Sequence, residues 1–185
     1  MSDDPTEETL MTAYLQGDQA AFEKLFGRLA PSIHGFFLRA FGSRAVADDL
    51  LQTTFLKVHR ARSQWKRDRK LRPWLFSIAA RVRLDELRRR YGLREDSGTE
   101  AVEKAADAAV PTEVADPAEQ ADVKDRVQAA LARLPESQRV VVQLHRFEGL
   151  TFAEIGEILG TSEGAVKLRA FRAYGELRQM LEDLL

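Results

Sequence analysis

The apolar residues of this chain recur at α-helical spacing almost throughout, and this periodicity restricts the chain to helical folds. Clear examples are the segments 22–29 and 140–147, in which apolar residues return every three or four positions. Val, Ile and Thr never alternate with polar residues over the length of a strand, and no Asn-Gly or Asp-Gly turn occurs. The sequence therefore predicts an all-α protein.

A change in composition divides the chain into two helical blocks. Between Gly92 and Pro117 aromatic residues are absent, and Ala, Glu, Asp and Thr dominate. Such a segment offers little apolar surface for a core of its own. We therefore expect a first domain over residues 1–91, a flexible acidic linker over 92–116 and a second domain over 117–185. Both domains are small, so help from a partner is expected.

The net charge of −1 conceals an uneven distribution of charge along the chain. Residues 60–90 include twelve basic and three acidic residues, whereas residues 92–125 include ten acidic and three basic ones. A solvated helix face normally mixes both signs, which makes it the weaker explanation. The basic segment therefore predicts a polyanionic partner, and the acidic one predicts a solvated, self-shielding segment.

Several classes of function lack the residues that they need. The chain has no cysteine and three widely separated histidines, His34, His59 and His145, so we expect no metal site and no cofactor. Paired carboxylates at useful spacing, a phosphate-binding glycine loop and a nucleophile–base arrangement are all missing, which disfavours an enzyme. With no membrane-spanning run and no secretory signal, we expect a cytoplasmic protein without membrane insertion.

The segment 151–177 has the pattern of a helix-turn-helix. A capping box predicts the start of a short helix at Thr151, Gly160 predicts the turn, and Ser162 predicts the start of a long second helix. Gly156 allows the two helices to approach closely. An αα-hairpin with a solvated face is the alternative, but the basic outer positions favour DNA binding. The candidate contacts on the second helix are Ser162, Lys167, Leu168, Arg169, Phe171 and Arg172.

A second candidate surface is the cationic connector at residues 63–72. Its composition suits a loop that holds a phosphate backbone while Trp65 offers a stacking surface to unpaired bases. A core position that clamps the base of the loop is the alternative for Trp65, and it is favoured for Trp74. The loop cations assigned to nucleic-acid contact are Lys66, Arg67, Arg69 and Lys70.

With these residues in view, the chain resembles an extracytoplasmic-function (group IV) sigma factor of bacterial RNA polymerase, within the sigma-70 family. Three segments in the expected order account for the resemblance. Residues 47–58 are similar to the polymerase-binding helix of the family, and residues 74–89 to its −10 region. Residues 134–139, with 154–156 and 164–173, are similar to its −35-reading domain.

The resemblance implies a region 2-like first domain, which binds the clamp helices of core RNA polymerase and reads and opens the −10 element. It implies a region 4-like second domain, which binds the polymerase flap and reads the −35 element. An anti-sigma protein is a further implied partner. The residues implied for polymerase binding are Asp48, Asp49, Gln52, Thr53, Phe55 and Leu56. Those implied at −10 are Trp65, Lys66, Arg67, Arg69, Lys70, Arg81 and Arg88, and those at −35 are the six residues of the second helix.

Two other functions compete with this one. A stand-alone helix-turn-helix regulator would explain the C-terminal half. It does not explain the basic segment 60–90 or the helix around Asp49 and Phe55. A small helical enzyme has no candidate site. Association with core polymerase would distinguish a sigma factor from a stand-alone regulator.

Overall fold

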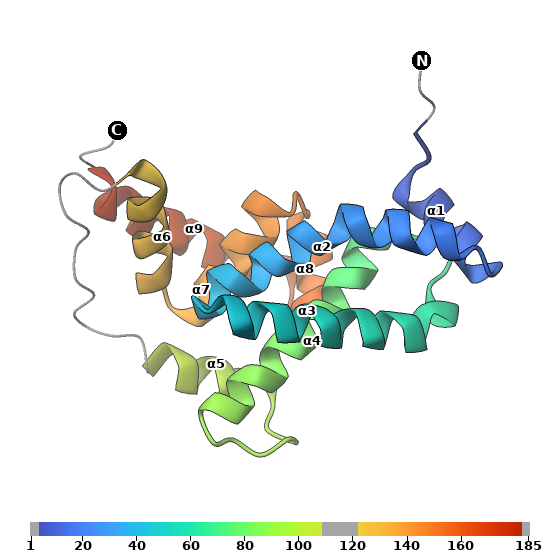
Figure 1. Cartoon of the computed structure of the whole chain (residues 1–185). Helices are drawn as coiled ribbons and strands as arrows, with labels where there is room; N and C mark the ends of the chain where they lie inside the picture. The colour runs from blue at the N-terminus through green and yellow to red at the C-terminus, as the bar shows by residue number, and fades with distance from the viewer. Residues whose placement is uncertain (1–3, 109–121, 183–185) are drawn as a thin grey trace. The chain divides into compact units, whose positions relative to one another are not determined.

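The structure, a computed structural model, describes residues 4–108 and 122–182. All regular elements in these ranges are helices, as the periodicity predicts, and Figure 1 shows their order along the chain. The chain divides into two compact units, 1–83 and 84–185. The division falls inside a helix and not at residue 91, where the composition places the end of the first domain. Among the described helices, none combines the length and apolar character that a bilayer crossing requires.

Unit 1 is built around two long helices. Its elements are α1 (Glu7–Leu15), α2 (Gln19–Phe41), α3 (Arg44–Ala61), the short 3-10 helix η1 (Arg62–Gln64) and most of α4 (Leu71–Arg90). Helix α2 packs against both α1 and α3, and Figure 1 shows α2 and α3 side by side. The largest side chains in this core are fully buried, and they include Met11, Ile33, Phe36, Phe37, Leu75 and Phe76. Burial of these aromatic rings stabilises the unit.

Local signals in the sequence set the ends of α2. The Asp18 carboxylate accepts a hydrogen bond from the Ala21 amide at 3.1 Å, and Gly42 ends the helix with a φ of 67°. Pro31 lies inside α2, where the sequence predicts a kink or a restart. The helix nevertheless continues, because Leu29 and Ile33 on either side are buried in the same core.

Unit 2 contains the last turns of α4 and the remaining helices. These are α5 (Thr99–Ala108), α6 (Val123–Arg133), α7 (Glu136–Val142), a π-helical turn η2 (Gln143–Phe147), α8 (Phe152–Leu159) and α9 (Glu163–Met180). Leu131, Leu134, Val142 and Ala173 form a buried cluster that joins α6, α7 and α9. The helix-turn-helix is thus seated on its own small core.

Helix α5 lies within the segment 92–116, where composition predicts a flexible or weakly ordered linker. The segment 92–116 has no aromatic residue, yet Thr99–Ala108 is helical, and Val102 and Ala106 are buried on one face of it. Composition missed this helix, because two small apolar side chains four residues apart are enough to seat a helix against a neighbour. Residues 109–116 lie outside the described part of the chain.

The turn between α8 and α9 depends on two glycines. Gly160 has a φ of 65°, a conformation that costs other residues free energy. Gly156 is buried in α8, and a Cβ atom there would lie 2.8 Å from the carbonyl oxygen of Thr161. The sequence predicts this close approach, and the structure locates it between α8 and the backbone that leads into α9.

We expect Gly156→Ala to lower the free energy of unfolding of unit 2 by roughly 1–3 kcal/mol, because the backbone of Thr161 must move to make room. Gly175→Ala is the matched control, since Gly175 lies in α9 with open space around its Cα. That variant should be more stable than the unmodified chain by about 0.5–1 kcal/mol. Urea unfolding followed by circular dichroism measures both. Equal midpoints for the two variants would contradict the close packing.

Candidate nucleic-acid interface

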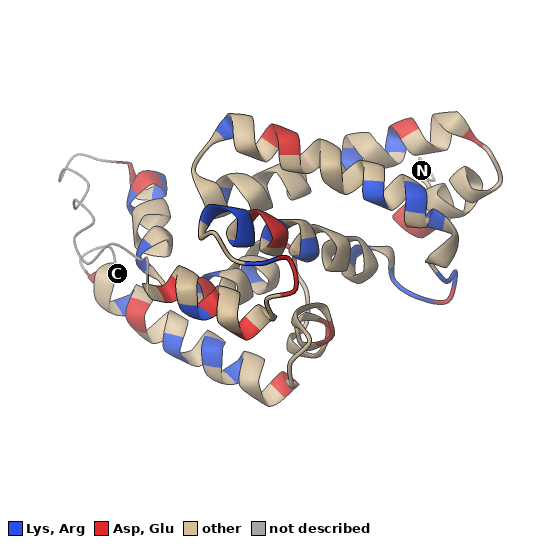
Figure 2. Cartoon of the chain, turned by 90° about the horizontal axis from the view of Figure 1, so that it is seen from below, with Lys and Arg blue, Asp and Glu red and all other residues tan. Residues whose placement is uncertain are grey.

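Helix α9 has one buried face and one exposed face. Val166, Ala170 and Ala173 are buried against the rest of unit 2, and the Oγ of Ser162 caps the helix by accepting a hydrogen bond from the Ala165 amide at 3.2 Å. Basic residues recur along the helix (Figure 2). Besides the cap Ser162, the candidate −35 residues that lie exposed are Lys167, Leu168, Phe171 and Arg172. They cover one turn and a half of α9 opposite its buried face.

The exposed side chains of α9 remain available to a partner. Phe171 is 79% exposed, so it does not pack α9 onto its neighbours. Lys167 pairs with Glu163 at 2.7 Å, but exposed pairs of this kind contribute little stability and separate easily. Arg172 has no side-chain partner among the described residues. This cationic and apolar surface matches the chemistry of phosphates and base edges.

Arg169 differs from the other cations of α9. Its Nη1 donates to Glu103 Oε1 at 2.8 Å and its Nη2 donates to Glu103 Oε2 at 3.0 Å, so α5 holds the guanidinium through two hydrogen bonds. Burial raises the pKa of Glu103, and the neighbouring Arg169 opposes that rise. The sequence placed Arg169 in the DNA-contacting set but gave no sign of this partner, which lies 66 residues earlier.

The cationic connector of unit 1 is exposed. Lys66, Arg67, Arg69 and Lys70 all lie at the surface between η1 and α4. For Lys66, Arg67 and Arg69 there is no side-chain partner among the described residues. A loop with this concentration of unpaired positive charge is suited to a phosphate backbone. The exposure of these side chains leaves the loop accessible to such a partner.

Trp65 does not offer the stacking surface that the sequence suggests. Its side chain is only 4% exposed, and the residue ends the short helix η1 with an amide hydrogen bond to the Arg62 carbonyl oxygen. Trp74 is half-buried at the start of α4. The core position, which was the alternative for Trp65, therefore describes it in this structure. We assign Trp65 to the base of the connector, where it clamps the loop.

The two arginines expected at −10 on α4 have different surroundings. Arg81 is exposed and has no side-chain partner among the described residues. Arg88 is mostly buried, with its Nη1 bonded to Asp85 at 2.8 Å and its Nε to the Ser97 carbonyl oxygen at 2.9 Å. Its neighbours Arg89 and Arg90 both pair with Glu86, and the hydrogen bond from Arg89 holds the pKa of Glu86 below its usual range. Of the two, Arg81 is the one free to meet a ligand.

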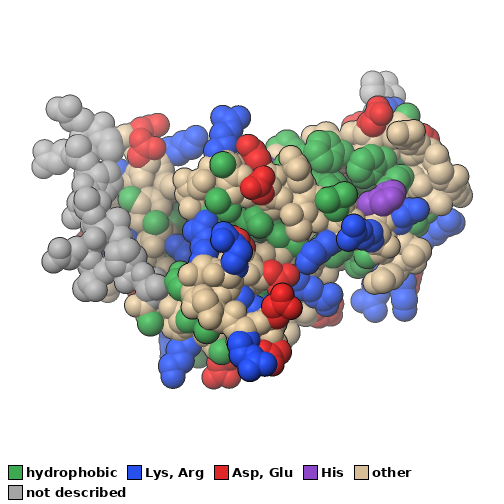
Figure 3. Space-filling model, turned by 60° about the horizontal axis from the view of Figure 1, so that its bottom comes forward, with side chains coloured by type: hydrophobic (Ala, Val, Ile, Leu, Met, Phe, Trp, Pro, Cys, Tyr) green, Lys and Arg blue, Asp and Glu red, His purple; other side chains and the backbone are tan. Residues whose placement is uncertain are grey.

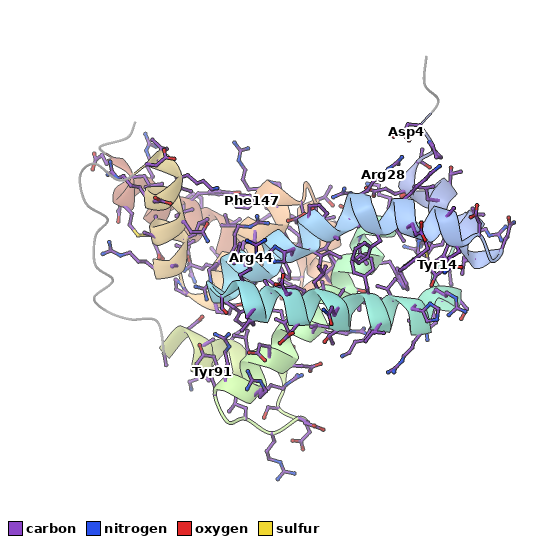
Figure 4. The ribbon with its side chains drawn as sticks, viewed as in Figure 1. Asp4, Tyr14, Arg28, Arg44, Tyr91 and Phe147 are labelled. Carbon is purple, nitrogen blue, oxygen red and sulfur yellow. The ribbon has the colours of Figure 1, made fainter. Side chains whose placement is uncertain are left out.

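Two acidic residues of α1 position the connector, and no pattern in the sequence points to either of them. Glu7 receives two hydrogen bonds from Arg72, at 2.8 and 3.0 Å, and Glu8 accepts the Leu71 amide at 3.0 Å. Glu8 thereby caps α4, whose first turn has no acidic residue of its own. The chain just before α1 is held by Arg28, which bonds the Asp4 carboxylate and the Pro5 carbonyl (Figure 4). No local pattern reveals partners more than sixty residues apart.

One face of α3 carries most of the residues expected to bind polymerase. Asp49, Gln52, Thr53 and Leu56 are all exposed. Their spacing of three, four and seven positions places them on one side of the helix. Leu56 is 59% exposed, so it offers apolar surface beside these polar groups. The face has the composition of a docking surface.

The other two candidates on α3 have partners within unit 1. Asp48 pairs with His34 of α2 at 2.9 Å. Phe55 is buried, with its ring centroid 4.6 Å from that of Phe26 and 6.4 Å from that of Phe22. Phe55 therefore supports the packing of α3 on α2.

An aromatic cluster lies beside this face. Tyr14 of α1 contacts Phe22, with ring centroids 4.7 Å apart, and its hydroxyl is hydrogen-bonded to Nδ1 of His59 (Figure 4). Burial raises the pKa of Tyr14. Figure 3 shows hydrophobic side chains gathered next to a histidine on the surface of the chain. The cluster anchors α1 to α2 and to the end of α3.

Models of two protein families match the chain, one in each half. The description "Sigma-70 region 2" matches residues 25–92, and "Sigma-70, region 4" matches residues 124–177. The first match contains α3, the connector and α4, and the second contains the helix-turn-helix. The two surfaces described above therefore lie in two separate sigma-70 regions.

Whole-chain relatives agree with these regional matches. RNA polymerase sigma factor CarQ of Myxococcus xanthus is 40% identical over 179 residues, which cover 94% of this chain and 97% of CarQ. ECF RNA polymerase sigma factor SigM of Mycobacterium tuberculosis is 32% identical over 180 residues, which cover 95% and 85%. The solved structure of CnrH, in complex with the cytosolic domain of CnrY, superposes with a TM-score of 0.67 at 26% identity over 96% and 97% of the two chains. This chain belongs to the extracytoplasmic-function RNA polymerase sigma factors of the sigma-70 family.

Proposed function

We propose that this chain binds core RNA polymerase and directs it to promoters by reading the −35 element with unit 2 and opening the −10 element with unit 1. The observation that carries the proposal is the presence of two exposed cationic surfaces in separate sigma-70 regions. Each has side chains suited to phosphates. The chain acts as an initiation factor and not as an enzyme, in the cytoplasm where the polymerase transcribes.

The −35 element is read by the exposed face of α9. Lys167 and Arg172 provide positive charge, and Leu168 and Phe171 provide apolar surface for the methyl groups of thymines. Both kinds of group lie on the second helix of a helix-turn-helix, the element that enters the major groove in this motif. Ser162 acts mainly as the cap that begins this helix.

The −10 element is held by the connector and the exposed side of α4. Lys66, Arg67 and Arg69 contact the phosphates, and Arg81 extends the surface along α4. Lys70 adds to the positive charge of the loop. The buried Trp65 and the Glu8 cap hold the two ends of the loop in place. A rigid cationic loop loses less conformational entropy when it closes on a separated strand.

Core polymerase is bound through the exposed face of α3. Asp49, Gln52 and Thr53 supply polar groups, and Leu56 supplies the apolar centre that a protein interface needs. Unit 2 adds a second contact, to the polymerase flap. CnrH was solved with the cytosolic domain of CnrY, and that complex supports a further protein partner for this chain, which we take to be an anti-sigma protein.

The first test is run-off transcription with core polymerase, combined with footprints on the promoter. We expect protection at two separate elements and transcripts that depend on the chain. A chain that binds DNA but never elutes with core polymerase on a sizing column would instead support a stand-alone regulator.

Replacing Lys66, Arg67 and Arg69 together by alanine tests the connector. We expect opening of the −10 element to fall at least about tenfold, because three cations that face the phosphates are lost while protection at −35 remains. Permanganate reactivity of unpaired thymines measures the opening. Lys24→Ala with Arg44→Ala removes exposed charge elsewhere in unit 1 and should have little effect. Unchanged opening in the connector variant would refute the assignment.

A further inference from the structure

Helix α5 is an integral part of unit 2. Val102 is fully buried and Ala106 is 3% exposed, and α5 packs against α7. These side chains lie one helical turn apart, so a single face of α5 is seated on the unit. Although the acidic segment is hydrophilic on average, this part of it is bound to the domain that carries α9.

A hydrogen-bonded cap strengthens this docking. Asp107 at the end of α5 accepts hydrogen bonds from the amide of Ser137 at 3.3 Å and from its hydroxyl at 3.0 Å. Ser137 lies in the first turn of α7, whose own N-cap residue, Pro135, provides no side-chain cap. Asp107 therefore satisfies a backbone donor that α7 leaves open. This contact fixes α5 to α7, the helix that packs against α9.

The same helix occupies a cation of the −35 surface. The two carboxylate oxygens of Glu103 bind the two terminal nitrogens of Arg169 at 2.8 and 3.0 Å, and the two side chains are 13% and 27% exposed. A guanidinium donates the same pair of N–H groups to a phosphate or to the edge of a guanine. Glu103 and DNA therefore cannot both form this bidentate interaction with Arg169.

We propose that α5 competes with promoter DNA for Arg169. The Glu103 carboxylate binds the guanidinium where two phosphate oxygens would bind it, until α5 moves away. This inference rests on the proposed function of α9. Lys167 and Arg172 remain exposed on the same helix, so α5 withholds Arg169 and does not cover the other two cations. The free chain thus binds DNA more weakly than α9 alone would allow, and release of α5 strengthens binding.

The decisive variant is Glu103→Gln in the full chain, with a fluorescently labelled DNA duplex of mixed sequence as the probe. We expect binding to become about three- to tenfold tighter at low salt. The slope of log K against log salt concentration should also steepen by about 0.9, the value for one added phosphate contact. Fluorescence anisotropy over a salt series measures both quantities. Phosphate contacts do not depend on sequence, so a mixed duplex is sufficient.

Two comparisons separate the ion pair from a general change in charge. Glu100→Gln removes the same charge from an exposed position of α5, one turn away, and should give a smaller gain. Glu103→Asp keeps the charge but shortens the side chain, and it should also tighten binding. A thermal melt of each variant shows that unit 2 remains folded.

Combination with Arg169→Ala tests the identity of the cation. In that background Glu103→Gln should give no gain beyond that of Glu100→Gln. A gain that persists without Arg169, or equal gains from Glu103→Gln and Glu100→Gln, overturns the inference. Lys167→Ala and Arg172→Ala serve as references for the proposed surface. If these two weaken binding while Glu103→Gln has no special effect, the α9 assignment stands and only the competition is refuted.

Discussion

The double variant Asp49→Lys, Leu56→Asp should lose association with core RNA polymerase by about 30-fold or more, a cost of roughly 2 kcal/mol that is typical of central interface residues. Both side chains are exposed on α3, so the substitutions remove an apolar contact and reverse a charge without opening the core of unit 1. Titration of labelled chain with core polymerase measures the loss. Transcription should fall in parallel.

Glu23→Lys is the matched control, because it reverses an exposed charge on the neighbouring helix α2. Phe55→Ala provides a contrast: its ring is buried with Phe22 and Phe26, so it should lower the stability of unit 1 and weaken association only through unfolding. Full association by the double variant would remove the polymerase-binding role of this face.

Simultaneous replacement of Lys167, Phe171 and Arg172 by alanine should weaken −35 binding by roughly 100-fold, with about 1 kcal/mol from each side chain. Two of the three are cations, so the salt dependence of binding should also become shallower by about two. None of the three is buried, and α9 keeps its packing face of Val166, Ala170 and Ala173. A promoter fragment defined by the footprints is the probe.

Arg178→Ala controls for loss of charge from α9, because Arg178 is exposed near the far end of the same helix. It should bind the −35 fragment almost as tightly as the unmodified chain. If the triple variant and Arg178→Ala behave alike, the binding is a diffuse electrostatic effect and the recognition surface lies elsewhere.

Much of the fold follows from local patterns. The capping box at Thr151, the cap at Asp18 and the left-handed turns at Gly42 and Gly160 are all in the structure where the residue types predict them. Such features depend on hydrogen bonds between residues a few positions apart, so the sequence carries them directly. The three segments that resemble sigma factors depend on the same local order, and the family matches cover them.

Exposure was harder to predict. The resemblance to sigma factors implies that Trp65 contacts the −10 element and that Phe55 contacts polymerase. Both side chains are nevertheless buried. Phe171 is aromatic too, and it is exposed. Residue type does not distinguish these cases, because burial is decided by which helices pack together and at what rotation.

The sequence alone determined the helical architecture, the helix-turn-helix and the family, since each is encoded by contacts within one or two turns of chain. Tertiary structure alone decided which charges are free. Glu7 and Glu8 reach Arg72 and the Leu71 amide, and Glu103 reaches Arg169, over more than sixty residues. These pairs form only after packing brings distant helices together, and the periodicity of the sequence does not show which helices will meet.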